Sequence, residues 1–230
     1  MLVLILPGWF AQASPQVEKK TWLPFISNSA SANPLHAGDG TYYAASGDGN
    51  CMFGPSPNDL MVAAMNDPDY NHAAVCGEYV RVTGPKGSVT VRIVDRCPEC
   101  KSGDLDLSPQ AFVKIADLAQ GRVPIHWQVV SGAVSGPIVY RFKEGSSQWW
   151  TAVQVRNHLN PVAKLEYLTG GQWVAVPRQD YNYFVQAGGM GPGPYAFRVS
   201  DAYGNVLTDS GIPLVVGGTV TGSGQFPPGP

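Results

Sequence analysis

The stretch YVRVTGPKGSVTVRIV, residues 79–94, is the clearest secondary-structure signal in this chain. Valine and isoleucine alternate with polar residues along both arms, and the arms are separated by Gly84-Pro85-Lys86-Gly87. Alternation with a period of two residues around a short turn rich in glycine and proline is typical of a β-hairpin. The sequence therefore predicts a first domain organised around a β-sheet.

Short helices are expected on either side of this hairpin. Residues 56–65 predict a helix with Ser56 as N-cap and Pro57 at the first helical position, and its apolar stripe consists of Leu60, Met61, Ala64 and Met65. Residues 108–119 repeat the Ser-Pro start, and Gly121 is a plausible C-terminal stop. Both segments are brief, so they are expected to accompany the sheet.

From residue 131 onward the pattern becomes almost purely β. One strand is expected just before this region, at 125–130. Five more are expected within it, at 138–142, 151–157, 163–168, 172–176 and 195–200, with turns at 170–171 and 203–205. Closely spaced strands without a helical pattern indicate a sandwich of about 90–100 residues. The Gly/Pro-rich tail, residues 221–230, either caps this domain or trails as an unstructured end.

Composition limits the class of protein. The chain has 230 residues, of which 14% are charged, and it contains 27 glycines and 20 prolines. This length allows one large or two smaller domains, and the composition is typical of compact, turn-rich β structure. The net charge of −2 argues against nucleic acid or an anionic membrane as the main partner. We expect a monomer.

The N-terminus resembles an export signal. Residues 1–13 carry no charge, begin with an apolar run, and end in the small-residue pattern Ala11-Gln12-Ala13. The segment has no positively charged start and is too short to span a bilayer. We expect a signal peptide at 1–13, a polar connector at 14–37, and secretion, with a strand or an N-terminal anchor as the alternative.

Four cysteines lie in the first half of the chain, and four thiols allow three pairings: Cys51, Cys76, Cys97 and Cys100. Disulfides are the default in a secreted protein. Cys97-Pro98-Glu99-Cys100 could instead be a redox pair, but such a pair is expected to open a helix, whereas this one follows a strand. A zinc site needs further ligands, and the four histidines are scattered singly. We therefore expect disulfides, no metal and no cofactor.

Trp149 and Trp150 are adjacent. Side chains alternate between faces along a strand, so at least one of these indoles is expected to face solvent, or both if the backbone bulges. A large exposed aromatic usually marks a contact surface, and a flat sugar ring is a suitable uncharged ligand. The alternative is a core tryptophan beside a half-buried one. Trp127 and Trp173 lie on strand patterns and are expected to be core.

Two carboxylates are candidates for chemistry in the first domain. Asp95 ends the apolar strand of the hairpin, and Asp106 lies between two leucines just before the second predicted helix. Asp106 could simply stabilise that helix start. A glycoside hydrolase uses two carboxylates around the scissile bond, so Asp95 and Asp106 are a candidate pair. Thr41 and Tyr43 complete the polar set.

Six short motifs resemble the expansin family, and the resemblance covers roughly residues 38–228. The motifs similar to the first domain of expansins are GTYY at 40–43, VDRCP at 94–98 and LDLS at 105–108. The motifs similar to the second domain of microbial expansins are KEGSSQWW at 143–150, VRNH at 155–158 and DYN at 180–182.

The resemblance implies a mainly β protein. It consists of a six-stranded double-psi β-barrel, expected at 38–131, followed by an immunoglobulin-like β-sandwich, expected at 132–228. It also implies binding of cellulose and matrix glucans, with peptidoglycan as another possible polymer, and loosening of plant cell walls without hydrolysis. By position, Thr41, Asp95 and Asp106 match the polar groove of the family, and Tyr43 is the fourth residue of the expected groove. The aromatic platform would consist of Trp149, Trp150 and Tyr181, with Lys143 beside it.

Two departures from related proteins affect the expected activity. Family-45 endoglucanases, which share this barrel, carry a catalytic-base aspartate a few residues after the threonine-tyrosine motif, where this chain reads Ala44-Ala45-Ser46. Asp106, which matches the general acid, would then lack a partner to activate water. Asp48 is close in sequence and could in principle substitute. We therefore expect a non-hydrolytic protein, with a weak endoglucanase or lytic transglycosylase, or a binding protein without loosening activity, as alternatives.

The second departure is Cys97, which stands where some bacterial members carry a groove tyrosine. If Cys97 is joined to Cys100, one sugar-stacking ring is lost from the groove and Cys51 pairs with Cys76, which is also the pairing that the resemblance to plant members implies.

Overall fold

The computed structural model describes residues 33–229. The expected signal peptide and most of the expected connector lie outside these residues. The first strand, β1 (His36–Tyr42), begins two residues before residue 38, the expected start of the barrel. Among residues 33–229, no helix is long and apolar enough to cross a membrane.

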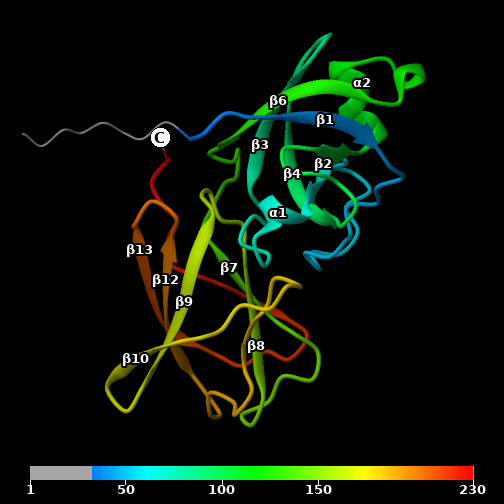
Figure 1. The fold of residues 1–230 in the computed structure, drawn as a ribbon. Helices are drawn as coiled ribbons and strands as arrows, with labels where there is room; N and C mark the ends of the chain where they lie inside the picture. The colour runs from blue at the N-terminus through cyan, green and yellow to red at the C-terminus, as the bar shows by residue number, and fades with distance from the viewer. Residues whose placement is uncertain (1–32, 230) are drawn as a thin grey trace, which may run out of the picture. The chain divides into compact units, whose positions relative to one another are not determined.

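Six strands close into a barrel in the order β1-β5-β2-β4-β3-β6 (Figure 1). After β1 they are β2 (Val62–Asn66), β3 (Tyr79–Gly84), β4 (Gly87–Cys97), β5 (Leu105–Leu107) and β6 (Val123–Val130). Strands β1 and β5 are parallel, as are β2 and β4, and the other pairs are antiparallel. The double-psi barrel expected from the sequence is confirmed.

The predicted hairpin is the pair β3 and β4, whose register runs from Gly84 opposite Gly87 to Tyr79 opposite Arg92. The second predicted helix is also present, as α2 (Pro109–Ile115), and the Ser108 side chain caps it by accepting from the Ala111 N–H at 3.1 Å. It ends earlier than expected, and a 3₁₀ turn, η1 (Leu118–Gln120), precedes Gly121. The hairpin arms and the capped helix therefore form where local sequence signals are strong.

The helix predicted at residues 56–65 is wrong. Ser56 instead closes a turn in which its carbonyl accepts from the Asp59 N–H at 2.9 Å, and residues 62–66 form β2. All five residues of β2 are buried, because β2 lies between β4 and β5 in the barrel. A short apolar run buried on both faces has no alternation, so periodicity cannot distinguish it from a helix. A four-residue helix, α1 (Asp67–Tyr70), follows directly after β2.

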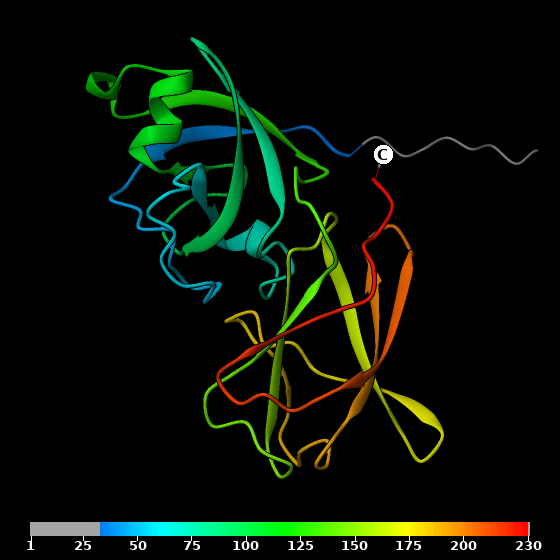
Figure 2. The ribbon, with the colours of Figure 1, turned by 180° about the vertical axis from the view of Figure 1, so that it is seen from behind.

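The second half of the described chain is a sandwich of two four-stranded antiparallel sheets, with the orders β10-β9-β12-β13 and β11-β8-β7-β14 (Figure 2). The strands are β7 (Val139–Phe142), β8 (Thr151–Arg156), β9 (Val162–Thr169), β10 (Gln172–Ala175), β11 (Phe184–Gln186), β12 (Tyr195–Asp201), β13 (Val206–Ile212) and β14 (Thr219–Thr221). Tyr140, Phe142 and Phe197 lie at its centre. The tail caps this domain, because β14 pairs with β7 and Phe226 is buried in the core.

The structure tests the predictions for the cysteines and for two of the tryptophans. The disulfides join Cys51 to Cys76 and Cys97 to Cys100, the pairing that the resemblance implies. Trp127 is core, as predicted, with 2% of its surface exposed. Trp173 is half-exposed, so its expected core position is wrong. It lies on the edge strand β10, where the Arg198 guanidinium covers its ring at 4.8 Å.

The barrel and the sandwich are joined by direct hydrogen bonds. The side-chain amide of Gln154 donates to the Cys51 carbonyl at 2.8 Å, and the Arg156 guanidinium donates to the Met52 carbonyl at 3.0 Å. A third bond runs from the Arg178 guanidinium to the Ala73 carbonyl at 3.1 Å. Cys51 and Met52 of the barrel are thus held by β8 of the sandwich.

Candidate functional site

Strand register aligns three of the four predicted groove residues, Thr41, Asp95 and Asp106, in one row. Thr41 of β1 lies opposite Asp106 of β5, which lies opposite Ala64 of β2, which in turn lies opposite Asp95 of β4. Residues paired in register on adjacent strands point to the same face of a sheet. The two carboxylates therefore flank the small side chain of Ala64, although they are far apart in sequence.

Asp106 is the best-defined member of this row. Its Oδ1 atom accepts a hydrogen bond of 2.6 Å from the Thr41 hydroxyl. Burial raises the pKa of the Asp106 carboxyl, and the charges of Glu99 and Asp95 raise it further, whereas the Thr41 bond and the Arg122 charge oppose this. Asp106 therefore holds a proton at higher pH than an ordinary aspartate does.

Asp95 is held by backbone groups. Its Oδ1 atom accepts the N–H of Asn50 at 2.7 Å and the N–H of Arg96 at 2.8 Å. The loop passes so close that any Cβ at Gly49 would overlap the Asp95 side chain, which explains the glycine. Asp95 is thereby engaged in fixing the loop over this end of the barrel.

Tyr43 completes the cluster. Burial, followed by the charges of Asp95 and Asp106, raises the pKa of its hydroxyl. That hydroxyl is buried and has no hydrogen-bond partner among residues 33–229. Tyr43 is therefore a neutral donor, positioned close enough to both carboxylates to be influenced by their charge.

A groove of about 300 Å³ opens at this row. Thr41 and Asp106 line it, whereas Tyr43 and Asp95 do not. Sequence reasoning missed the other charged lining residues, which are Asp39, Glu99, Lys101, Asp104 and Arg122. The disulfide of Cys97 and Cys100 forms part of the wall, so no aromatic ring is present at position 97.

Asp48 does not line this groove. Its carboxylate accepts the backbone N–H groups of Gly49 at 3.0 Å and Gly54 at 3.2 Å. Asp48 therefore closes its own loop, which is a structural role for the residue considered as a substitute base.

The adjacent tryptophans lie at a turn, not along a strand. The Ser147 N–H donates to the Trp150 carbonyl at 2.7 Å, so Gln148 and Trp149 form the tip of a tight two-residue turn. Trp149 is 73% exposed, and Trp150 is half-buried. The expected solvent-facing tryptophan is present, but a turn rather than strand alternation or a bulge exposes it.

A second loop supports this turn. The Gly191 N–H donates to the Gln148 carbonyl at 3.1 Å, and the Met190 N–H donates to the Thr151 hydroxyl at 3.1 Å. Gly189 has a φ of 76°, and a Cβ there would overlap the Gln148 carbonyl. The exposed indole of Trp149 is therefore carried by a braced backbone.

Tyr181 and Lys143 both lie close to the ring of Tyr183. The Tyr181 ring lies 6.1 Å from the Tyr183 ring, and the Lys143 ammonium lies 5.7 Å from the same ring. Tyr183 is buried, whereas Tyr181 and Lys143 are half-buried. Among the described residues, no ring contact joins either tryptophan of the turn to Tyr181.

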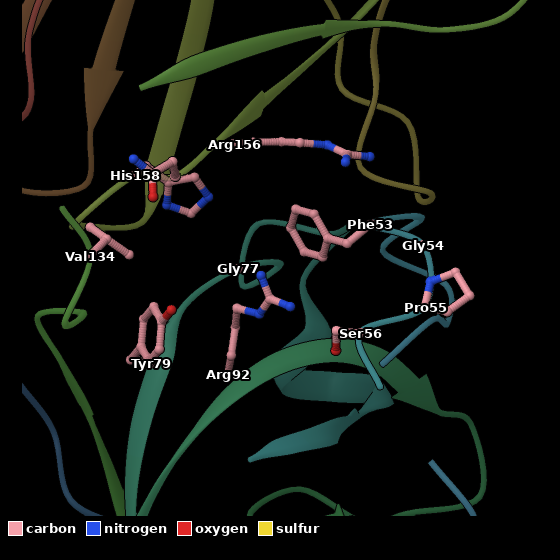
Figure 3. Close-up of a pocket in the computed structure, with 11 residues that line it drawn as sticks. Phe53, Gly54, Pro55, Ser56, Gly77, Tyr79, Arg92, Val134, Arg156 and His158 are labelled. Carbon is pink, nitrogen blue, oxygen red and sulfur yellow. The ribbon is translucent and has the colours of Figure 1, made fainter. Parts of the chain in front are cut away.

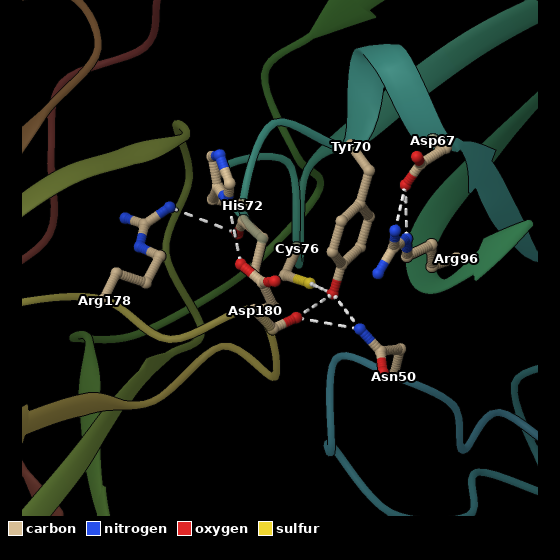
Figure 4. Close-up of polar contacts among 9 residues, drawn as sticks. Asn50, Asp67, Tyr70, His72, Cys76, Arg96, Arg178 and Asp180 are labelled. Atoms are coloured by element: carbon tan, nitrogen blue, oxygen red, sulfur yellow. Dashed lines mark hydrogen bonds and ion pairs between the residues drawn. The ribbon is translucent and has the colours of Figure 1, made fainter. Parts of the chain in front are cut away.

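A polar bridge that sequence reasoning missed links the barrel to Asp180 (Figure 4). The Tyr70 hydroxyl and the Asn50 side-chain amide both donate to the Asp180 carbonyl at 2.8 Å, and the same amide donates to Tyr70 at 2.9 Å. Asp180 directly precedes Tyr181, and the Asn50 backbone holds Asp95. No sequence motif signals this bridge, because its members come together only in the folded chain.

Comparison with known proteins places this arrangement in a family. The family model described as lytic transglycolase matches residues 61–127. The chain is 42% identical over 209 residues to Expansin-YoaJ of Bacillus subtilis (strain 168), covering 86% of this chain and 90% of the relative. It is 28% identical over 204 residues to Expansin-like protein 5 of Dictyostelium discoideum, covering 83% and 84%.

Solved structures agree. The apo expansin of Clavibacter michiganensis superposes with a TM-score of 0.78 at 34% identity, covering 84% of this chain and 99% of that one. A point variant of that expansin, solved in complex with cellohexaose, superposes with a TM-score of 0.79 at the same identity and coverage. With a long, closely similar relative and this shared two-part architecture, the chain belongs to the expansin family.

Proposed function

We propose that this protein is secreted, binds cellulose and matrix glucans, and loosens plant cell walls without cutting the polysaccharide. The observation that carries the proposal is the braced, 73% exposed Trp149 beside the half-buried Trp150. The cellohexaose complex of the Clavibacter relative supports a β-glucan as ligand. Two disulfides fit an oxidising compartment and hence export.

The sandwich would supply most of the affinity. Trp149, Trp150 and Tyr181 would stack on glucose rings of one cellulose face, with the Lys143 ammonium at the margin. Aromatic stacking on nucleobases contributes roughly 1–3 kcal/mol per ring, and sugar faces should lie on a comparable scale.

The barrel groove would act on a single glucan strand. The Asp106 carboxyl and its partner Thr41 would exchange hydrogen bonds with sugar hydroxyls and so compete with bonds between glucan chains. Binding can shift such a junction only by the difference in affinity between its loosened and tight forms. The proposed limits of these two domains are 38–131 and 132–228.

Absence of hydrolysis is part of the proposal. Ala44-Ala45-Ser46 offers no carboxylate where the related endoglucanases place their base, and the Asp48 carboxylate is bonded within its own loop. Asp106 alone could protonate a leaving group but could not activate water.

Lytic activity is the second candidate, favoured by the lytic transglycolase match and by the raised pKa of Asp106, which suits a general acid. Incubation with peptidoglycan and with soluble β-glucan, followed by chromatography of the soluble fraction, tests it. We expect no released products from either polymer, and released muropeptides or oligosaccharides would establish the lytic reading instead.

The experiment that tests the binding proposal is a pull-down of the purified protein on microcrystalline cellulose, with the Trp149→Ala variant beside it. We expect retention of the wild-type protein and a clear loss for the variant. Equal retention of both proteins would remove the basis for the platform.

A further inference from the structure

Figure 3 shows a second pocket, which has a volume of about 280 Å³. Its wall comes from the loop that follows Cys51, from strands β3 and β4, and from the end of β8. None of the residues of the groove or the platform lines it. Its volume is close to the lower end of the range typical of small-molecule sites.

Two guanidinium groups contribute to this pocket. The Arg92 and Arg156 guanidiniums lie 5.2 Å and 5.6 Å from the centre of the Phe53 ring, which lies between them in Figure 3. A cation over an aromatic face is held in place electrostatically, so Phe53 orients both groups. Two like charges that share one ring repel each other, and an anion bound between or beside them would relieve this repulsion.

Neither guanidinium forms an ion pair within the described residues, although the exposed Glu144 carboxylate is near enough to Arg156 to interact with its charge. Among residues 33–229, no carboxylate lies within ion-pair distance of Arg92 or Arg156, and none lines the pocket. The buried Nε atom of Arg92 has no hydrogen-bond partner. Burial raises the pKa of Tyr79 in the pocket wall, and the negative charge of Asp59 contributes to this rise. The Asp59 carboxylate itself accepts a hydrogen bond from the Met61 N–H within its own turn and does not line the pocket.

Hydroxyl and apolar groups complete the wall. Ser56 and Tyr79 supply hydroxyls, whereas Phe53, Pro55 and Val134 supply apolar surface. His158 adds no charge above about pH 5, because burial lowers its pKa to about 4. A wall that combines cations, hydroxyls and apolar surface fits a ring that carries hydroxyls and one carboxylate better than it fits a bare inorganic anion.

We propose that the pocket of Arg92 and Arg156 is an anion-recognising sugar subsite that binds a uronic-acid unit of an acidic polysaccharide. The guanidiniums pair with the carboxylate, and the Ser56 and Tyr79 hydroxyls bond the ring hydroxyls. Because the subsite shares no residue with the cellulose platform, the two surfaces can hold two different wall polymers at once.

Calorimetric titration of the full chain with trigalacturonic acid tests the proposal, with its methyl ester and inorganic phosphate as comparison ligands. We expect the acid to bind at low ionic strength, to bind at least tenfold more weakly in 0.5 M NaCl, and to bind at least tenfold more tightly than the ester. Equal binding of acid and ester would overturn the proposal, as would phosphate binding as tightly as the acid.

Variants locate the site. Arg92→Gln and Arg156→Gln each keep a polar side chain but lose the charge, and each should weaken trigalacturonate binding at least tenfold. Arg81→Gln, an exposed position on β3, is the matched control and should change nothing. Retained cellohexaose binding shows that a variant is folded. Unchanged trigalacturonate binding in folded Arg92→Gln overturns the assignment, and the acid-against-ester comparison on the wild-type protein decides independently if a variant fails to fold.

Discussion

The Tyr70 hydroxyl donates a 2.8 Å hydrogen bond to the backbone carbonyl of Asp180, the residue that precedes Tyr181. Tyr70 belongs to the barrel and is 2% exposed, and its bond joins the two halves of the described chain at a partly buried position. Asn50 reinforces it and also holds Asp95 of the groove row. A short chain of hydrogen bonds thus connects the groove row to the residue that precedes Tyr181 of the proposed platform.

Tyr70→Phe should lower the free energy of unfolding by about 1–2 kcal/mol, because it leaves the Asp180 carbonyl with one donor instead of two. Urea unfolding followed by circular dichroism measures this change. The matched control is Tyr42→Phe, since the Tyr42 hydroxyl donates to the Leu118 carbonyl at 3.3 Å on the surface and should contribute less than about 0.5 kcal/mol. Equal effects of the two variants would mean that the Tyr70 bond does not stabilise the junction.

Trp149→Ala should weaken cellulose binding by about 1–3 kcal/mol, because the exposed indole supplies one stacking surface. Depletion isotherms on microcrystalline cellulose measure the change. Trp173→Ala is the control, since Trp173 is a half-exposed tryptophan on the opposite sheet and is covered by Arg198. A similar loss for both variants would indicate nonspecific adsorption and not a platform.

Asp106→Asn should abolish wall loosening and leave cellulose binding intact. The amide is isosteric with the carboxyl and can still accept from Thr41, so the fold should persist while charge and proton exchange are lost. Extension of wall strips and cellulose pull-down, run in parallel, separate the two effects. Asp117→Asn, at an exposed carboxylate paired with Lys86, is the control and should loosen walls normally. Full loosening by Asp106→Asn would remove the groove from the mechanism.

Glu78→Gln should stabilise the protein more at pH 8 than at pH 5. Glu78 is 7% exposed, and burial raises its pKa from 4.5 to about 8, against the opposing charge of Arg178. The folded protein therefore retains a proton that the unfolded chain has lost, so the Glu78 contribution is fully present below pH 4.5 and is lost as the pH rises towards 8. The neutral amide avoids this loss.

The difference in Tm between Glu78→Gln and wild type should grow by roughly 5–10 °C from pH 5 to pH 8, as thermal unfolding at both values would show. Contributions from His158 are common to both proteins and cancel in this comparison. Glu144→Gln, at an exposed carboxylate, should show little growth. A constant difference between Glu78→Gln and wild type would contradict the raised pKa.

The parts of the fold that were predictable are those in which local signals and tertiary structure agree. The hairpin of β3 and β4 shows its alternation in sequence, and Ser108 caps α2 with its own side chain. The helix prediction at residues 56–65 was wrong because residues 62–66 form a strand that is buried on both faces and carries no periodic signal. The core position predicted for Trp173 was wrong because its strand lies at the edge of a sheet. Whether a strand lies at an edge depends on the sheet order and not on the local sequence.

Sequence reasoning supplied the residue types of the candidate site but not their geometry. Motif resemblance located Thr41, Asp95 and Asp106, yet only strand register shows that they share a row. Strand alternation predicted that a tryptophan at 149–150 is exposed. In the structure the exposure instead results from the turn at Gln148, which Ser147 closes. Asn50 and Tyr70 could not be found, since nothing in the sequence pairs them with Asp180.

The most direct test of the account is the extension of heat-inactivated plant wall strips under constant load, with released sugar assayed in the same bath. The account predicts extension on addition of the wild-type protein and no soluble oligosaccharide above the buffer control. Extension accompanied by released sugar would contradict it, because a second group would then be activating water beside Asp106. Absence of extension despite cellulose binding would equally contradict it and leave a protein that only binds the wall.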